Sequence, residues 1–294
     1  MLVATLISNP KDGALDAALA IKASAVAGAS GVYWLADRVA CDLPLRAGTD
    51  ARSMEAALRD AMGDAPVDVV VQDQETRRKK ILIADMDSTM IDQECIDELA
   101  DEAGIKAHVA AITERAMNGE IAFEPALRER VALLRGLPCS VIEHVIGTRI
   151  TLAAGGAQLV ATMKKSGART ALVSGGFTRF TGPIAKMLGF DEQSANRLVE
   201  QDGMLSGEVE EPILGRQAKA EALNRLAAGR GLTLADAIAV GDGANDLDML
   251  ALAGTGVALH AKPMVAARAR FRIDHADLTA LLYMQGYREA DFVG

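Results

Sequence analysis

The acidic residues Asp85 and Asp87 follow a short apolar run, residues 81–84, and are the first side chains here that could do chemistry. Such a run is typical of a buried parallel strand, and two carboxylates at its end can converge on one small volume. Adjacent anions raise each other's pKa unless a cation separates them. The pair indicates a divalent metal, an acid–base couple, or both. Taken alone, an acidic surface turn explains it equally well.

A second acidic group follows the apolar run 237–240. Asp242 and Asp246 add two carboxylates, and Asn245 adds an amide. Four acids that converged without a cation would repel one another, so an ordinary turn rich in Asp and Asn is the weaker interpretation. Oxygen ligands that share a site with a phosphate are typical of Mg²⁺, which is therefore the expected cofactor.

Two further segments could bind an anion. Ser174 and Gly175 follow the predicted strand 170–173 and precede a predicted helix, so backbone N–H groups there could approach a phosphate. A plain turn explains these residues when they are considered alone. Lys219 lies in the predicted helix 214–228, where most lysines face solvent, and gains weight only because an anionic nucleophile and a phosphate need a cation between them.

The elements that must position these residues alternate between strand and helix from residue 81 onward. This alternation predicts an α/β fold, a doubly wound parallel sheet with its site at the carboxyl ends of the strands. Residues 93 to about 152 interrupt the alternation, because they predict four helices with breaks near 104, 118–119 and 136–138. We interpret this stretch as an inserted helical cap.

The first part of the chain predicts a separate small domain. Its order βαββαβ indicates a ferredoxin-type α+β unit over residues 1–76, with Asp50 as the N-cap of a helix at 51–62. The polar run 72–80 has no apolar side chain, so we expect it to be a linker that does not pack in a core. The second domain then covers residues 79–294.

Composition excludes several classes of function. The 294 residues carry 31 Lys and Arg against 40 Asp and Glu, a net charge of −9, which would repel a nucleic-acid backbone. No uncharged apolar run approaches the roughly 18 residues of a membrane span, so no membrane partner is expected. The three cysteines are far apart and predict reduced thiols in a cytoplasmic protein, and the four scattered histidines make a zinc site improbable.

Taken together, the four segments resemble the motifs of the haloacid dehalogenase-like hydrolases, in order and each at its expected element. Residues 85–91 with Glu94, and residues 123–131, 173–178, 195–198 and 240–246, resemble the SerB-type phosphoserine phosphatases within that superfamily. The resemblance covers residues 79 to about 290 and implies a Rossmann-like core with an inserted cap. It also implies Mg²⁺-dependent hydrolysis of O-phospho-L-serine, the last step of L-serine biosynthesis.

The resemblance assigns roles to the core residues. Asp85 would be the nucleophile that forms an aspartyl-phosphate, and Asp87 would be the general acid and base. The metal would be held by Asp85, the backbone carbonyl of Asp87 and Asp242, with support from Asp246. Phosphate-binding groups would come from the following residues: Ser174, Gly175, Lys219 and Asn245.

The resemblance also assigns substrate selection to the cap. A selective site needs an anion for the ammonium of phosphoserine and a bidentate cation for its carboxylate. Glu94 and Arg130 resemble the residues with these tasks, and Met117 and Phe123 would form an apolar wall. Without the family, both charged residues would be interpreted as solvated helix positions.

Some alternatives stay open. The first domain resembles an ACT-type regulatory module, but its first turn, residues 9–13, is not a convincing ligand-binding turn; effector binding, formation of a homodimer or cap support would each fit. A related phosphatase or phosphotransferase could act on phosphothreonine, phosphohomoserine or a sugar phosphate. A non-catalytic amino-acid sensor is the rival from another class, and the intact acidic residues and Lys219 weigh against it.

Overall fold

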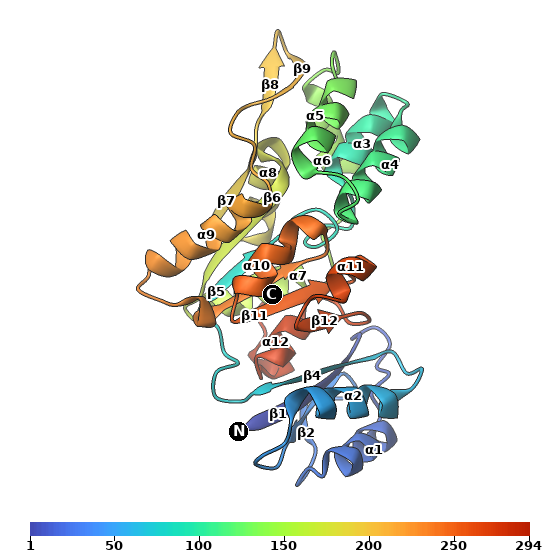
Figure 1. Cartoon of the computed structure of the whole chain (residues 1–294), viewed down its shortest axis with the longest axis vertical. Coiled ribbons are helices and arrows are strands. Elements are labelled where there is room, and N and C mark those ends of the chain that lie inside the picture. The colour runs from blue at the N-terminus through green and yellow to red at the C-terminus, as the bar shows by residue number, and fades with distance from the viewer. The chain divides into compact units, whose positions relative to one another are not determined.

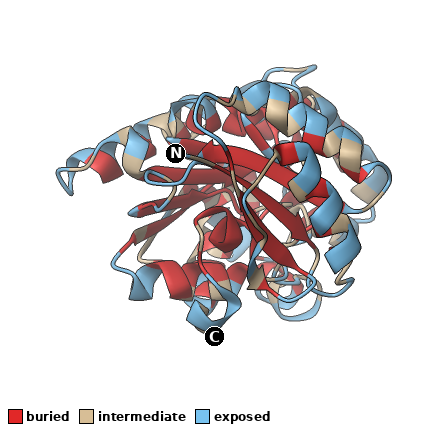
Figure 2. Cartoon of the chain, turned by 90° about the horizontal axis from the view of Figure 1, so that it is seen from below, coloured by how far each residue is buried: buried red, intermediate tan, exposed pale blue.

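The computed structural model describes all of residues 1–294 and divides into two compact units. The smaller unit holds residues 1–80, 154–168 and 271–294, and the larger unit holds residues 81–153 and 169–270. Figure 2 shows the strands as buried and many helices as buried on one side and exposed on the other. None of the helices is both long and apolar enough to cross a membrane. The division into domains over 1–76 and 79–294 stays a prediction.

The smaller unit begins with the predicted βαββαβ order. Its elements are β1 (Leu2–Ser8), α1 (Ala17–Ala27), β2 (Tyr33–Ala36), β3 (Ala40–Pro44), α2 (Ala51–Met62) and β4 (Val67–Asp73). The strands form an antiparallel sheet in the order β2-β3-β1-β4, with one core shared by sheet and helices. The predicted N-cap is confirmed, because the Asp50 carboxylate accepts from the backbone N–H of Ser53.

Later segments complete this unit: α7 (Gly156–Lys165), β12 (Phe271–Ile273), α12 (Ala280–Met284) and the short 3₁₀ turn η3 (Glu289–Asp291). They explain why the linker expectation for residues 72–80 was partly wrong. Gln72 lies in β4 and is buried, and its side chain donates to the carbonyl of Met284. Lys79 is also buried, and its backbone N–H donates to the side chain of Gln285. A polar run can pack where its hydrogen bonds are satisfied.

The larger unit contains the predicted parallel sheet. Strands β5 (Ile81–Ala84), β6 (Arg169–Phe177), β7 (Glu192–Asn196), β10 (Ala237–Gly241) and β11 (Thr255–Leu259) lie in the order β11-β10-β5-β6-β7, and every neighbouring pair is parallel. The other elements of this part are α8 (Thr178–Leu188), α9 (Arg216–Ala228), η1 (Leu234–Asp236), η2 (Ala244–Asp246), α10 (Leu247–Leu252) and α11 (Pro263–Ala266). Apolar residues of the strands and of α9 and α10 form its core.

The predicted helical insertion is present as α3 (Cys95–Glu102), α4 (Lys106–Met117), α5 (Phe123–Leu133) and α6 (Ser140–Thr148), a group that Figure 1 shows in green. Strands β8 (Leu198–Gln201) and β9 (Met204–Val209) form a hairpin, which turns at Asp202 and Gly203 with positive φ angles of 52° and 76°. This hairpin contacts the cap, because Leu205 exchanges backbone hydrogen bonds with Gly136 and Leu137.

Asp68 generates a prediction about stability. Its carboxylate is fully buried in β4 and accepts from the backbone N–H groups of Asp274, His275 and Ala276 at 2.7, 3.2 and 2.9 Å. Asp68→Ala leaves these donors without an acceptor, so we expect the free energy of unfolding to fall by about 2–4 kcal/mol in urea titrations. Asp64→Ala, an exposed control in the same unit, should change it by less than about 0.5 kcal/mol. Equal effects would contradict the role of this carboxylate.

Candidate active site

Three adjacent strands bring the core residues together. Strand β5 lies between β10 and β6, so the carboxyl ends of all three meet at one edge of the sheet. Asp85 follows β5, Asp242 follows β10, and Ser174 lies in the last part of β6. All three are buried. The sheet therefore gathers residues that are far apart in the sequence, as the alternation predicted.

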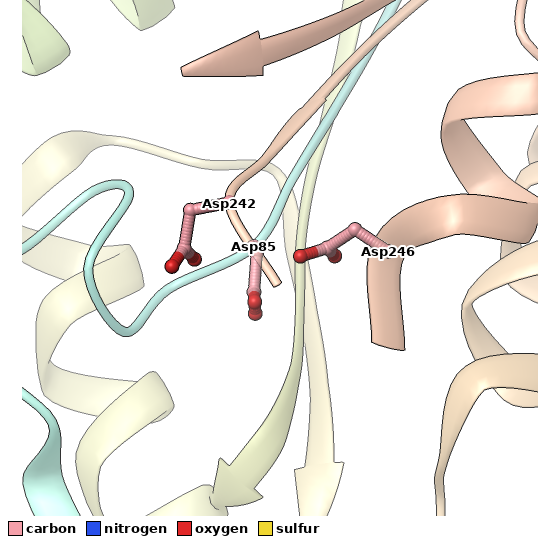
Figure 3. A group of neighbouring side chains, drawn as sticks. All are labelled: Asp85, Asp242 and Asp246. Atoms are coloured by element: carbon pink, nitrogen blue, oxygen red, sulfur yellow. The ribbon is translucent and has the colours of Figure 1, made fainter. Parts of the chain in front are cut away.

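The acidic residues form one buried cluster. Carboxylate oxygens of Asp85, Asp242 and Asp246 lie within 4.8 Å of one another. In Figure 3 the Asp85 carboxylate lies between the other two, which come from the turn after β10 and the start of α10. Lys219 of α9 is 1% exposed, and its Nζ is 2.7 Å from Oδ1 of Asp85 and 2.7 Å from Oδ1 of Asp246. Lys219, whose helical position taken alone would suggest a solvated face, is the cation of this cluster.

The charges of the cluster do not balance. Burial and the carboxylates of Asp246 and Asp85 raise the pKa of Asp242 well above its usual range. Burial, followed by Asp85, raises the pKa of Asp246 to about 7 despite its contact with Lys219. Burial lowers the pKa of Lys219, but both of its carboxylate partners outweigh that effect and hold the pKa above its usual value. One lysine is thus too little positive charge for three carboxylates.

The donors around this cluster fit a divalent cation. The buried Oδ1 of Asn245 has no hydrogen-bond partner. The Asp242 carboxylate accepts only a long hydrogen bond, 3.4 Å, from the Thr89 hydroxyl. Hard divalent ions take such oxygen ligands, and a second cation would offset the excess negative charge. The residues present therefore suit a metal ion of this class.

Asp87 is not one of the three clustered carboxylates and binds other groups. Its Oδ1 accepts from the backbone N–H of Cys95 at 2.8 Å, and its Oδ2 accepts from the Ser174 hydroxyl at 3.1 Å. Burial and the neighbouring Asp85 raise its pKa. Gly176 must lack a side chain, because a Cβ there would lie 2.8 Å from Oδ2 of Asp87. These contacts hold the Asp87 carboxyl, with its raised pKa, in the same cavity as Asp85.

The segment 174–177 was expected to follow the strand 170–173, but this strand extends further along the chain. The segment belongs to the end of β6, where pairing with β7 shifts register between Val173 and Phe177. Asn196 of β7 holds this end: its Nδ2 donates to the carbonyls of Gly175 and Leu214 at 2.8 and 3.1 Å. No role was predicted for Asn196, and only its place in a family-like segment pointed to it.

The cap contributes two opposite charges that do not pair with each other. Glu94 precedes α3, and its carboxylate accepts from the Ser88 hydroxyl at 2.8 Å. Burial, Asp87 and Asp242 raise its pKa well above the usual range. Arg130 of α5 is 3% exposed and donates to the Ala126 carbonyl and the Thr113 hydroxyl. Neither residue is on a solvated helix face.

One partly open cavity joins the core and the cap. Its volume is about 30 Å³. Ten of the twelve predicted site residues line it: Asp85, Asp87, Glu94, Met117, Phe123, Arg130, Ser174, Gly175, Asp242 and Asn245. The other two, Lys219 and Asp246, belong to the charge cluster with Asp85. Phe123 also lines a larger hollow of about 520 Å³, so its ring stands between the cavity and this hollow.

Comparisons with known proteins agree with this geometry. Residues 82–251 match the haloacid dehalogenase-like hydrolase family. The chain is 40% identical over 235 residues to "Phosphoserine phosphatase SerB2" of Mycobacterium tuberculosis, covering 79% of this chain and 57% of that protein. It is 42% identical over 206 residues to the phosphoserine phosphatase of Methanocaldococcus jannaschii, covering 70% of this chain and 97% of that protein. The chain thus spans little more than half of the mycobacterial relative.

Solved structures show the same similarity. A phosphoserine phosphatase solved as a phospho-aspartyl intermediate analogue has a TM-score of 0.67 and 42% identity, covering 70% of this chain and 98% of that one. A probable phosphoserine phosphatase from Vibrio cholerae has a TM-score of 0.79 and 30% identity, covering 99% of this chain and 88% of that one. The second similarity extends over both units.

The Lys219 cluster generates a second prediction. Lys219→Met leaves two buried carboxylates without their cation, so we expect the free energy of unfolding, measured by urea titration in EDTA, to fall by about 3–5 kcal/mol. Lys186→Met, on an exposed position of α8, should stay within about 0.5 kcal/mol of the starting protein. A loss below about 1 kcal/mol in Lys219→Met would show that the cluster does not depend on this cation.

Proposed function

The chain belongs to the phosphoserine phosphatase family of the haloacid dehalogenase-like hydrolases, and we propose that it hydrolyses O-phospho-L-serine to L-serine and phosphate. This would be the last step of L-serine biosynthesis. The observation that carries the proposal is one cavity with a buried carboxylate cluster at its core side and, at its cap side, an acidic and a basic side chain, Glu94 and Arg130, that do not pair with each other.

The cap charges suit the amino-acid end of this substrate. Phosphoserine carries an ammonium and a carboxylate on one carbon atom. Glu94 and Arg130 line the same cavity, and each is held by a neutral hydroxyl group and not by an opposite charge. A carboxylate is a good partner for an ammonium, and the fork of a guanidinium matches a carboxylate. A sugar phosphate offers neither group, so it would leave both buried charges uncompensated.

Asp85 would perform the first chemical step. Lys219 and the backbone N–H of Met86 both bind its Oδ1, and no hydrogen bond of the protein uses its Oδ2. Oδ2 would attack phosphorus, forming the aspartyl-phosphate as the bond from phosphorus to the seryl oxygen breaks. Asp87, whose raised pKa favours its protonated form, would give its proton to that oxygen.

The second step returns the enzyme to its starting state. Water would attack phosphorus and lose a proton to Asp87 while the bond between phosphorus and Asp85 breaks, releasing phosphate. Ser174, the backbone N–H of Gly175, Lys219 and Asn245 would bind the phosphoryl oxygens during both steps. Water must be excluded before the first step and admitted before the second, and Met117 and Phe123 form the apolar wall beside the reacting groups.

Mg²⁺ is the proposed cofactor. Asp85, Asp242 and the backbone carbonyl of Asp87 would hold it, and Asp246 would support these ligands. When bound, it would supply positive charge that offsets the repulsion between a carboxylate and a phosphate dianion. The unpaired Oδ1 of Asn245 and the raised pKa of Asp242 support a cation here. A homodimer and a cytoplasmic location stay predictions.

The decisive experiment compares substrates. Initial rates on L-phosphoserine, L-phosphothreonine and glucose 6-phosphate should favour phosphoserine, should require added Mg²⁺ after EDTA treatment, and should fall to background in Asp85→Asn. An amide oxygen is a poor nucleophile, so Asp85→Asn activity within about tenfold of the starting protein, a barrier change of only ~1.4 kcal/mol, would contradict the covalent step. A preference for either other substrate would contradict the proposed specificity.

Arg130 gives the sharpest prediction for specificity. Arg130→Ala should lower kcat/KM for phosphoserine about thirty- to a thousandfold, since a charge-assisted bidentate contact contributes roughly 2–4 kcal/mol. Activity on p-nitrophenyl phosphate, which has no carboxylate, should change little. Arg130→Lys should restore only part of the loss. Arg115→Ala, on an exposed position of the cap, is the matched control. Equal losses on both substrates would assign Arg130 to the fold or to the phosphate site.

A further inference from the structure

Thr113 and Asp97 lie behind the guanidinium of Arg130, where sequence reasoning assigned no role. Thr113 of α4 is 3% exposed, and its Oγ1 accepts from Nη1 of Arg130 at 3.0 Å. The same hydroxyl donates to Oδ1 of Asp97, on α3, at 2.7 Å. Arg130 is on α5, so the Thr113 hydroxyl joins three cap helices, α3, α4 and α5.

The direction of these hydrogen bonds is determined by chemistry. A guanidinium can only donate, and an ionised carboxylate can only accept. The Thr113 hydroxyl has one proton and two lone pairs, so it must accept from Arg130 and can give its proton to Asp97. The carbonyl of Val109, at 3.1 Å, is the longer alternative for that proton. Asp97 thus orients the hydroxyl with a lone pair toward the guanidinium.

The interposed hydroxyl holds Arg130 without cancelling its charge. A direct ion pair with Asp97 would occupy the fork of the guanidinium and neutralise it. In the structure the hydrogen bonds of Arg130 use Nε, to the Ala126 carbonyl, and Nη1, to Thr113, and none of them reaches a carboxylate. None of these hydrogen bonds uses Nη2, and Arg130 is among the residues that line the cavity.

We propose that Thr113, oriented by Asp97, is a positioning residue that holds the guanidinium of Arg130 ready for the carboxylate of the substrate. This proposal rests on the proposed function. It goes further because it makes substrate selection depend on two residues that do not line the cavity. A valine at position 113 has nearly the same shape but no oxygen, so it removes the contact and keeps the packing.

The first test separates substrate binding from chemistry. Thr113→Val should raise KM for phosphoserine about five- to thirtyfold and leave kcat within roughly threefold, while kcat/KM for p-nitrophenyl phosphate stays within roughly twofold. Thr113→Ser should restore the KM of the starting protein. The matched control is Thr148→Val, since that hydroxyl only donates to a carbonyl of its own helix, His144. A KM unchanged in Thr113→Val, or equal losses on both substrates, overturns the proposal.

A second measurement does not depend on the substrate. In protein labelled with ¹⁵N-arginine, the Arg130 side-chain signals are those missing from Arg130→Lys. Slow exchange of its N–H protons and separate Nη signals are expected in the starting protein, with faster exchange in Thr113→Val. Unchanged signals in Thr113→Val overturn the positioning role. If the signals change as expected but the starting protein does not hydrolyse phosphoserine, the proposed function fails and the positioning of Arg130 stands.

Discussion

The contact of Lys219 with Asp85 and Asp246 is the interaction on which the site depends. Parallel strands deliver carboxylates to one buried edge, where each anion makes its neighbour costlier to ionise. The positive charge of Lys219 offsets part of this repulsion. The lysine also binds Oδ1 of Asp85, so only Oδ2 stays free. The charge left over after one lysine is what suits a divalent cation and a phosphate. The same contacts thus bear on the stability of the cluster, on its fit for a metal ion and on which oxygen of Asp85 stays free.

In the cap, two ionisable side chains are each held by a neutral hydroxyl group. Neither Glu94 nor Arg130 is hydrogen-bonded to a group of opposite charge. Hydroxyl groups hold them instead: Ser88 holds Glu94, and Thr113 holds Arg130. A neutral partner fixes the direction of a charged group and leaves its charge for a ligand. The core edge would therefore recognise the phosphate, and the cap would recognise the amino-acid end.

Much of the fold could be predicted because its strands and helices have strong local patterns. The helix at 51–62 and the strand at 81–84 have the predicted bounds. β7 was missed as a strand of the sheet, because its residues, Glu192 to Asn196, are mostly polar and lack the apolar run of a central strand. Gln72 and Lys79 were expected in a linker and are buried, because their partners come from the other end of the chain.

By itself, the sequence determined which residues could do chemistry and that they would meet, because polar residues directly after apolar runs must collect at one edge of a parallel sheet. Only the tertiary structure decided how those residues divide their tasks. Nothing in the spacing of Lys219 shows that it lies between Asp85 and Asp246. Nothing around Thr113 distinguishes it from any other helical threonine. Both roles depend on contacts between helices and strands that are distant in sequence, and local patterns carry no information about the direction of such a side chain.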